Sequence, residues 1–178
     1  MGRTVPSPPT ETPGIYQTSA LWNAQVRDLN NFALGAPVFA GYASSSQSIP
    51  GSNAMTALTL DTERFDLDGG HSTVTNTSRY TATVPGTYFV IATVGWSANA
   101  TGDRRLQVGL NGAAVIGSGV SFDPSQVVLC GMQTSAFVTM NGSTDYVEAM
   151  AAHTAGTTLS TTGGGVFAPS LCVLWISR

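Results

Sequence analysis

The feature that most constrains the fold is the strand pattern of residues 87–98. Side chains of a strand point alternately to its two faces, and here every second residue is apolar. The residues expected on this apolar face are Tyr88, Val90, Ala92, Val94 and Trp96. More polar strand patterns lie on either side, at residues 76–83 and 105–110. The sequence therefore predicts three consecutive strands at the centre of an all-β fold.

The connections between these strands carry turn signals. Pro85-Gly86 ends the first strand, and Asn111-Gly112 follows the third. Asn-Gly between alternating segments is a strong hairpin signal because both residues tolerate positive φ. Further strands are expected at residues 38–43, 47–49, 54–60, 65–67, 127–140 (interrupted at Gly131), 144–153 and 171–176, with a crossing loop at 113–124. About nine or ten strands at this spacing are typical of a β-sandwich.

Several of these segments together resemble a known family. Residues 79–82 (RYTA) and 85–90 (PGTYFV) look like the signature of C1q-like domains, which belong with the tumour necrosis factor (TNF) jelly rolls. Phe65-Asp66, residues 68–71 (DGGH) and the segment from Asn141 to Glu148 are similar to further family segments, although Ser143-Thr144 replaces the usual glycine. The segment at 99–104 (NATGDR), followed by a strand and Asn-Gly, is most similar to C1q-like modules on bacteriophage structural proteins. The resemblance covers residues 38–176.

The resemblance implies a jelly roll of about ten antiparallel strands, three copies of which pack around an axis. The sequence agrees in one respect, since two strands are apolar on both faces and a sandwich strand normally turns one face to water. Leu174 and Ile176 lie opposite the face of Leu171, Val173 and Trp175, and Phe89 and Ile91 lie opposite the face of Tyr88. We expect a neighbouring subunit to cover the second face. The residues expected at the trimer contact are Tyr146, Met150, Trp175 and Phe89.

Residues 1–36 differ in character from residues 37–178, which form the expected jelly-roll domain. The first fourteen residues are rich in proline and predict an extended arm without a core of its own. Thr18 or Ser19 could cap a helix that runs to about Leu34, before Gly35 and Pro37. Its apolar stripe consists of Trp22, Val26, Leu29 and Ala33, and Leu21 and Phe32 widen it. The residues expected to attach the helix to a partner are Trp22, Val26, Leu29 and Phe32. This helix would pack on its own jelly roll, bundle about a three-fold axis, or attach the chain to a larger assembly.

Composition excludes several classes of function. Only 10% of the residues are charged and the net charge is −3, whereas a nucleic-acid site needs a basic stripe. No stretch approaches the eighteen or so apolar residues of a membrane-spanning helix, and the N-terminus lacks the apolar core of a signal peptide. Low charge combined with 42% apolar residues favours a surface that another chain covers. Cys130 and Cys172 lie in apolar strand patterns and are expected to be free thiols.

The sequence contains no convincing catalytic or cofactor motif. His71 and His153 are the only histidines, and both are expected to be structural. Gly117-Ser118-Gly119 lacks the spacing of a nucleophile elbow, and Gly163-Gly164-Gly165 lacks the lysine and helix of a phosphate loop. Asp61, Asp66 and Asp68 could offer oxygen ligands to calcium, but without the spacing of a dedicated loop we expect no metal site. We expect neither enzymatic activity nor a cofactor.

Together these observations favour a non-enzymatic virion protein, a phage tail or capsid decoration component assembled in the host cytoplasm. Residues 1–36 would attach it to other virion proteins, and the trimeric module would contact a host cell-surface glycan or protein. The absence of lysine is compatible with a host of high GC content. The alternative is a soluble trimeric lectin-like module that binds glycan without any role in a virion. A basic or aromatic-lined loop cluster would favour that alternative.

Overall fold

The computed structural model describes residues 4–7, 10, 12–14, 16–123 and 129–178, and it has the expected all-β jelly-roll architecture. A five-stranded sheet has the order β10 (Cys130–Met140), β6 (Gly86–Trp96), β13 (Ser170–Ser177), β1 (Val38–Tyr42) and β4 (Thr62–Asp66). All of its pairings are antiparallel. The long strands β6 and β13 lie at its centre, so their backbone groups are paired on both sides.

A second sheet faces the first. It has the order β3 (Thr56–Ala57), β11 (Tyr146–His153), β7 (Arg104–Leu110) and β8 (Ala113–Ala114), and β5 (Arg79–Thr81) and β9 (Val120–Phe122) pair with β11 and β7. A small ladder joins β2 (Ser48–Ile49) to β12 (Leu159–Ser160). The described residues thus form thirteen strands, more than the nine or ten expected, because several short pairings carry little sequence signal.

Two sequence predictions about strands are wrong in detail. The expected crossing loop at residues 113–124 contains β8 and β9, which pair with opposite ends of β7. The strand expected to break at Gly131 is continuous as β10, because Gly131 stays in register opposite Gly95. The first residues of that predicted strand, 127 and 128, lie outside the described residues.

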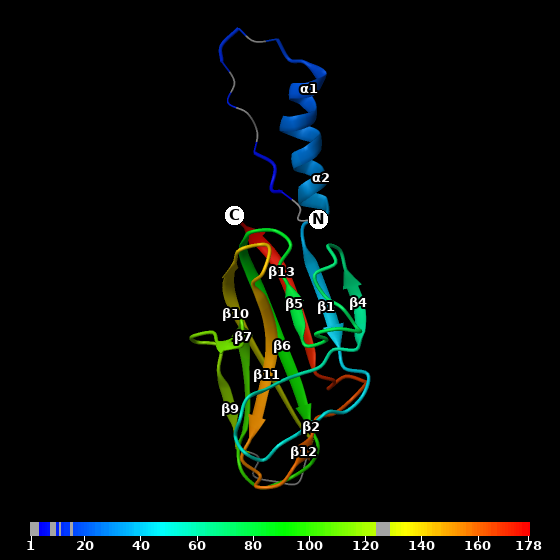
Figure 1. Cartoon of the computed structure of the whole chain (residues 1–178), viewed down its shortest axis with the longest axis vertical. Coiled ribbons are helices and arrows are strands. Elements are labelled where there is room, and N and C mark those ends of the chain that lie inside the picture. The colour runs from blue at the N-terminus through cyan, green and yellow to red at the C-terminus, as the bar shows by residue number, and fades with distance from the viewer. Residues whose placement is uncertain (1–3, 8–9, 11, 15, 124–128) are drawn as a thin grey trace.

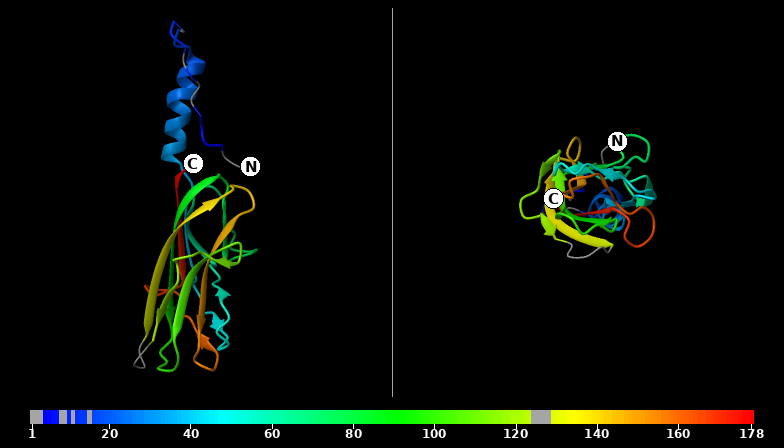
Figure 2. Two further views of the ribbon diagram at one scale, coloured as in Figure 1. Left: turned by 90° about the vertical axis from the view of Figure 1, so that its left-hand side faces the viewer. Right: turned by 90° about the horizontal axis from the view of Figure 1, so that it is seen from below.

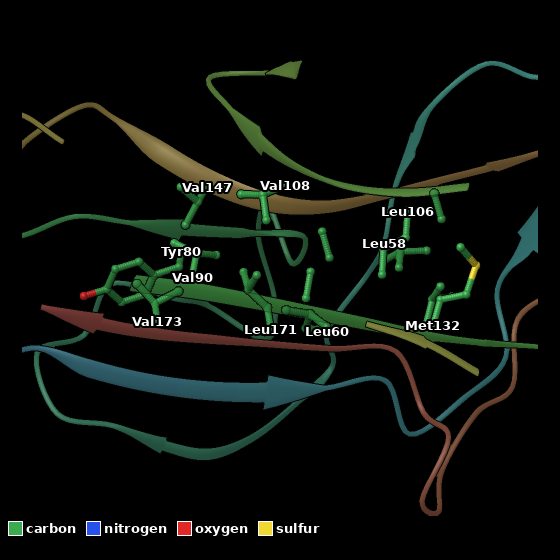
Figure 3. Packing of buried hydrophobic residues seen from close by; sticks show 14 of the residues in the cluster. Leu58, Leu60, Tyr80, Val90, Leu106, Val108, Met132, Val147, Leu171 and Val173 are labelled. Atoms are coloured by element: carbon green, nitrogen blue, oxygen red, sulfur yellow. The ribbon is translucent and has the colours of Figure 1, made fainter. Parts of the chain in front are cut away.

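The core lies between the two sheets, where the inward faces of the strands meet (Figure 3). The central alternation behaves as predicted, since Tyr88, Val90 and Trp96 are fully buried. Val173 and Leu171 of β13 pack with Val147 and Val108 of the second sheet in the same cluster. Each fully buried side chain of this size stabilises the fold by about 1.5–3 kcal/mol.

The predicted helix is present and extends from one end of the sandwich along its long axis (Figures 1 and 2). It consists of α1 (Ser19–Trp22), a π-helical segment (Asn23–Arg27) and α2 (Asp28–Leu34). The hydroxyl oxygen of Thr18 accepts from the backbone N–H of Leu21 at 3.2 Å, which caps the first turn as expected. The π-helical turn shifts the apolar stripe, because each of its turns contains more residues than an α-helical turn. None of the helices in the described part of the chain is long and apolar enough to cross a membrane.

Candidate assembly surface

The two histidines lie in structural environments. The ring of His71 stacks on Phe39 at 4.7 Å, its Nδ1 lies 2.7 Å from Glu63 Oε1, and its Nε2 lies 3.0 Å from the carbonyl of Thr77. His153 is fully buried. Its Nε2 donates to the carbonyl of Ile49 at 2.9 Å, while Nδ1 accepts from the N–H of Ala155 at 3.2 Å. Because all four ring nitrogens contact the protein's own groups, neither histidine is placed to act as a base.

The three aspartates considered for calcium instead accept hydrogen bonds from nearby groups. Asp66 accepts from the backbone N–H groups of residues 68–71 and so closes a turn. The Ser44 backbone N–H and hydroxyl hold the pKa of Asp61 below its ordinary value. Asp68 accepts from the hydroxyls of Tyr80 and Thr83, and burial raises its pKa. Among the described residues no group of three or more His, Cys, Asp or Glu side chains could hold a metal ion.

The other two motifs are also structural. Ser118 is fully buried, and its hydroxyl donates to the carbonyl of Val115 at 2.8 Å and accepts from the N–H of Val108 at 3.1 Å. It therefore ties the β8–β9 connection to β7 and is not exposed as a nucleophile. In the triple-glycine segment, a Cβ at Gly163 would collide with the backbone of Ser45. Gly163 therefore allows close packing of two loops.

The outer face of the five-stranded sheet carries an apolar surface with exposed side chains from β10 and β13. Its first cross-strand row joins Phe137 of β10, Phe89 of β6, Leu174 of β13 and Val38 of β1. The rings of Phe137 and Phe89 lie 5.0 Å apart. The second row, one pleat further from the helix, includes Ile91 and Cys172. We call these two rows the apolar face.

Exposure shows that the single chain does not cover this face. Phe137 is 67% exposed, and Ile176 and Leu174, which continue the same side of β13, are 50% and 37% exposed. Large apolar side chains that lie side by side in this way mark contact surfaces. The next row joins Gln133, Thr93 and Ser170, followed by Tyr42 of β1, so on β10, β6 and β13 the apolar face ends where the sheet becomes polar.

An apolar groove borders the apolar face at the edge of β10. Its volume is about 420 Å³, and Phe137 and Val138 form one wall. Leu110, Val115 and the fully exposed Ile116 form the other. Phe137 therefore belongs both to the face and to the groove, which together present two different apolar areas on one chain.

The structure does not bring the four predicted trimer-contact residues onto one surface. Phe89 lies on the apolar face, but Tyr146 and Met150 belong to β11 in the opposite sheet. Met150 is only 9% exposed because it packs over Gly109, and the guanidinium of Arg79 lies 4.1 Å above the Tyr146 ring. The alternation in the sequence separated the two faces of β11. It could not show which of its side chains the neighbouring strands β5 and β7 would cover.

Trp175 has a different position from the one expected. It lies at the inward side of β13, where Nε1 donates to the carbonyl of Pro85 at 3.3 Å. Its ring meets Phe32 of α2 edge-on at 5.1 Å. Trp175 is therefore the residue of the sandwich on which the base of the helix packs. Phe137 was missed by the sequence analysis, although its alternation with Met132, Ala136 and Val138 could have placed it on the outer face.

The helix contacts its own sandwich mainly at its base. Phe32 is 7% exposed, so it is not free to attach the chain elsewhere, in contrast to the prediction. The other members of the predicted stripe are more exposed, with Trp22 at 55% and Leu29 at 40%, and Val26 is half-buried. Leu34, beside the sandwich, is 87% exposed. The helix thus presents an apolar surface to which the jelly roll contributes little.

The two cysteines are unpaired and occupy different environments. Cys130 is buried on the inward side of β10, whereas Cys172 belongs to the apolar face. Burial raises the pKa of both thiols, which keeps them protonated and unreactive near neutral pH.

Comparisons with known proteins identify the fold. No protein-family model and no curated protein sequence matches the chain. Among solved structures, the globular domain of zebrafish complement 1qA superposes with a TM-score of 0.56 at 15% identity, covering 80% of this chain and 98% of that domain. Murine APRIL superposes with the same TM-score at 10% identity, covering 78% of this chain and 98% of that one. The chain therefore has a C1q/TNF-like jelly-roll fold.

Proposed function

We propose that this protein is a non-enzymatic structural component of a virion, a tail or capsid decoration protein that presents a homotrimeric C1q/TNF-like module. The observation that carries the assembly part of the proposal is the exposed apolar face of β10, β6 and β13. An apolar surface of this kind on a protein with few charges is best explained by a permanent partner. A second copy of the chain is the simplest partner.

The two apolar areas favour a ring rather than a two-fold dimer. A contact between different patches on neighbouring copies is heterologous, and such contacts generate closed rings when the rotation closes. The apolar face and the groove bordered by Ile116 lie on adjacent surfaces of one chain, so one copy can offer its groove edge to the face of the next. Three copies are expected from the resemblance to C1q-like domains.

The virion role is supported by the division of the chain into a projecting segment and a presented module. Residues 1–36 would attach to other virion proteins, since the helix stands beyond the sandwich and keeps Trp22 and Leu29 exposed (Figure 2). The opposite end of the jelly roll is then free to contact a host cell surface. The contacts of His71 and His153 with the protein's own groups agree with the structural roles expected for both residues.

The test has two parts. Light scattering coupled to size exclusion should give three times the monomer mass of 18.4 kDa at micromolar concentration. Immunogold labelling of particles from the source lysate should then place the protein on a tail or a capsid. A monomer in the first experiment contradicts the trimer, and label found only on free protein contradicts the virion role. A trimeric protein found only in the soluble fraction would favour the lectin-like alternative.

A further inference from the structure

A pocket of about 240 Å³ opens on the outer face of the five-stranded sheet, beyond the apolar face. It lies toward the end of β6 that is remote from the helix (Figure 1). Its walls come from Thr93 of β6, Gln133 of β10, and Val166 and Phe167 of the loop between β12 and β13. The pocket is therefore placed in the half of the module that the attachment segment leaves free.

Two glycines form the floor on which the loop lies. Gly95 and Gly131 are cross-strand partners, so this part of the sheet has no side chains on its outer side. The Phe167 ring occupies that space, since a Cβ on Gly131 would lie 2.9 Å from its Cδ1 atom. The hydroxyl of Thr162 donates to the carbonyl of Phe167 at 2.6 Å, and the N–H of Thr162 donates to the carbonyl of Gly95 at 2.8 Å.

One face of the Phe167 ring packs on the glycine floor, and the rest of the ring is open to solvent. Its exposed fraction is 49%, so much of the ring remains accessible to a ligand. Fixing the ring on the glycine floor reduces the entropy that a ligand would lose by ordering it. The loop thus holds an aromatic platform in position.

The polar groups beside the platform are neutral. The Gln133 side chain is exposed, and its amide makes no hydrogen bond within the part of the chain that the structure describes. The Thr93 hydroxyl lies 2.6 Å from the Ser170 hydroxyl. None of the described residues that line the pocket is charged. The site therefore combines apolar and hydrogen-bonding surface without attracting an ion.

We propose that this pocket binds one ring of a neutral saccharide. A sugar ring presents C–H groups on one face and hydroxyls around its rim, which match the Phe167 ring and the Gln133 amide respectively. The volume is below the roughly 300–1,000 Å³ of sites for drug-sized ligands, which limits the occupant to about one ring. The inference rests on the proposed host contact and assigns it a chemical class.

Two other pockets fit this ligand less well. The groove beside Ile116 has an almost entirely apolar lining, which suits a protein contact. The pocket around Asp68, Thr81 and Ser143 has polar walls but no aromatic side chain. Of these three pockets, the Phe167 pocket is the one that combines an accessible aromatic ring with an unpaired amide.

Saturation-transfer NMR with the full-length protein tests the inference. The probes are the methyl glycosides of glucose, galactose and N-acetylglucosamine, with N-acetylneuraminic acid as the charged comparison. We expect ring C–H signals from at least one neutral glycoside, and at least tenfold weaker signals in Phe167→Ala and Gln133→Ala. Phe122→Ala is the matched control, because Phe122 is 48% exposed but lies on β9, away from the pocket.

Three outcomes would overturn the inference. These are no transfer to any neutral glycoside, transfer that persists in Phe167→Ala, or transfer to N-acetylneuraminic acid alone. Light scattering of the same samples separates this inference from the proposed assembly. A trimer that binds none of the sugars refutes the pocket alone, and a monomer that binds a sugar through Phe167 refutes only the assembly.

Discussion

At the scale of single residues, the group that links the loops to the core is Asp68. The hydroxyl of the fully buried Tyr80 donates to both of its carboxylate oxygens, at 2.9 and 3.0 Å, and the Thr83 hydroxyl donates as well. Tyr80 in turn stacks on Phe39, which stacks on His71. The segment that resembles the family's turn is thus fixed to the core through one carboxylate.

Replacing Asp68 with Ala should lower the free energy of unfolding by about 1–3 kcal/mol, because the buried hydroxyl of Tyr80 loses its acceptor. Tyr80→Phe should cost less, since it removes the buried hydroxyl itself. The double variant should then be less destabilised than the sum of the two single variants. Urea unfolding followed by circular dichroism measures all three, and strict additivity would contradict the described contact.

Asp68 should also give stability a specific pH dependence. Burial raises its folded-state pKa above the ordinary value of 3.8, so the folded protein binds this proton more tightly than the unfolded chain. The contribution is therefore fully present below 3.8 and is lost as the pH rises through the folded pKa. The stability of the wild type minus that of Asp68→Asn should be larger at pH 3.5 than at pH 7. Equal differences at both pH values would show that the carboxyl is not desolvated.

At the scale of elements, the outer face of β13 carries apolar side chains that a monomeric β-sandwich would not be expected to expose. A central strand with Leu174 and Ile176 on its second face has no advantage for a monomer in water, where exposed apolar area stabilises nothing. The same side chains become favourable when a neighbouring copy covers them. The apolar face of β13 is therefore the feature of this element on which the proposed assembly depends.

Leu174→Asp should dissociate the proposed trimer without unfolding the chain. The substitution places a charge at each copy's contact and removes apolar burial of about 1.5–3 kcal/mol per copy, which corresponds to at least a tenfold weaker association. Sedimentation velocity measures the state of assembly, and circular dichroism checks the fold. Val74→Asp is the control, because Val74 is 85% exposed in a loop away from this face and should leave the trimer intact. A trimeric Leu174→Asp variant would exclude β13 from the interface.

The end of the helix near Phe32 packs on the sandwich, whereas the part that carries Trp22 and Leu29 is exposed. Phe32→Ala should therefore destabilise the chain by about 1–2 kcal/mol through the lost contact with Trp175, whereas Trp22→Ala should stay within about 0.5 kcal/mol. Thermal unfolding monitored by tryptophan fluorescence and circular dichroism compares the two. Equal losses of stability in the two variants would mean that the part of the helix around Trp22 is also packed on the jelly roll.

At the scale of the whole molecule, the separation of attachment and presentation leads to a test by truncation. Among the described residues, the helix contacts the sandwich mainly through Phe32, so residues 37–178 are expected to remain a folded trimer without residues 1–36. The same variant should no longer be incorporated into particles, because a helix of this length is marginal alone and requires a partner surface. Quantitative immunoblotting of purified particles measures incorporation. Wild-type occupancy by the truncated protein would contradict the attachment role.

The sequence alone determined the features that depend on local order along the chain. The alternation around Tyr88, the turns at Pro85-Gly86 and Asn111-Gly112, and the Thr18 cap all depend on residues within a few positions of one another. Side-chain direction in a strand has a period of two, so the two faces of β6 and β13 could be separated directly. The all-β sandwich class and the helix could therefore be predicted from local pattern, and the jelly-roll class was implied by the resemblance to C1q-like domains.

Only the tertiary structure decided which faces remain uncovered. Alternation assigned Tyr146 and Met150 to one side of β11. It could not show that Met150 would pack over Gly109 or that the Arg79 guanidinium would cover the Tyr146 ring. It also could not bring Phe167 from a loop onto the glycine floor of Gly95 and Gly131, which are thirty-six positions apart in sequence and adjacent in the sheet. Burial depends on strand register and on which loop crosses which sheet. These are long-range pairings, and no short stretch of sequence encodes both partners.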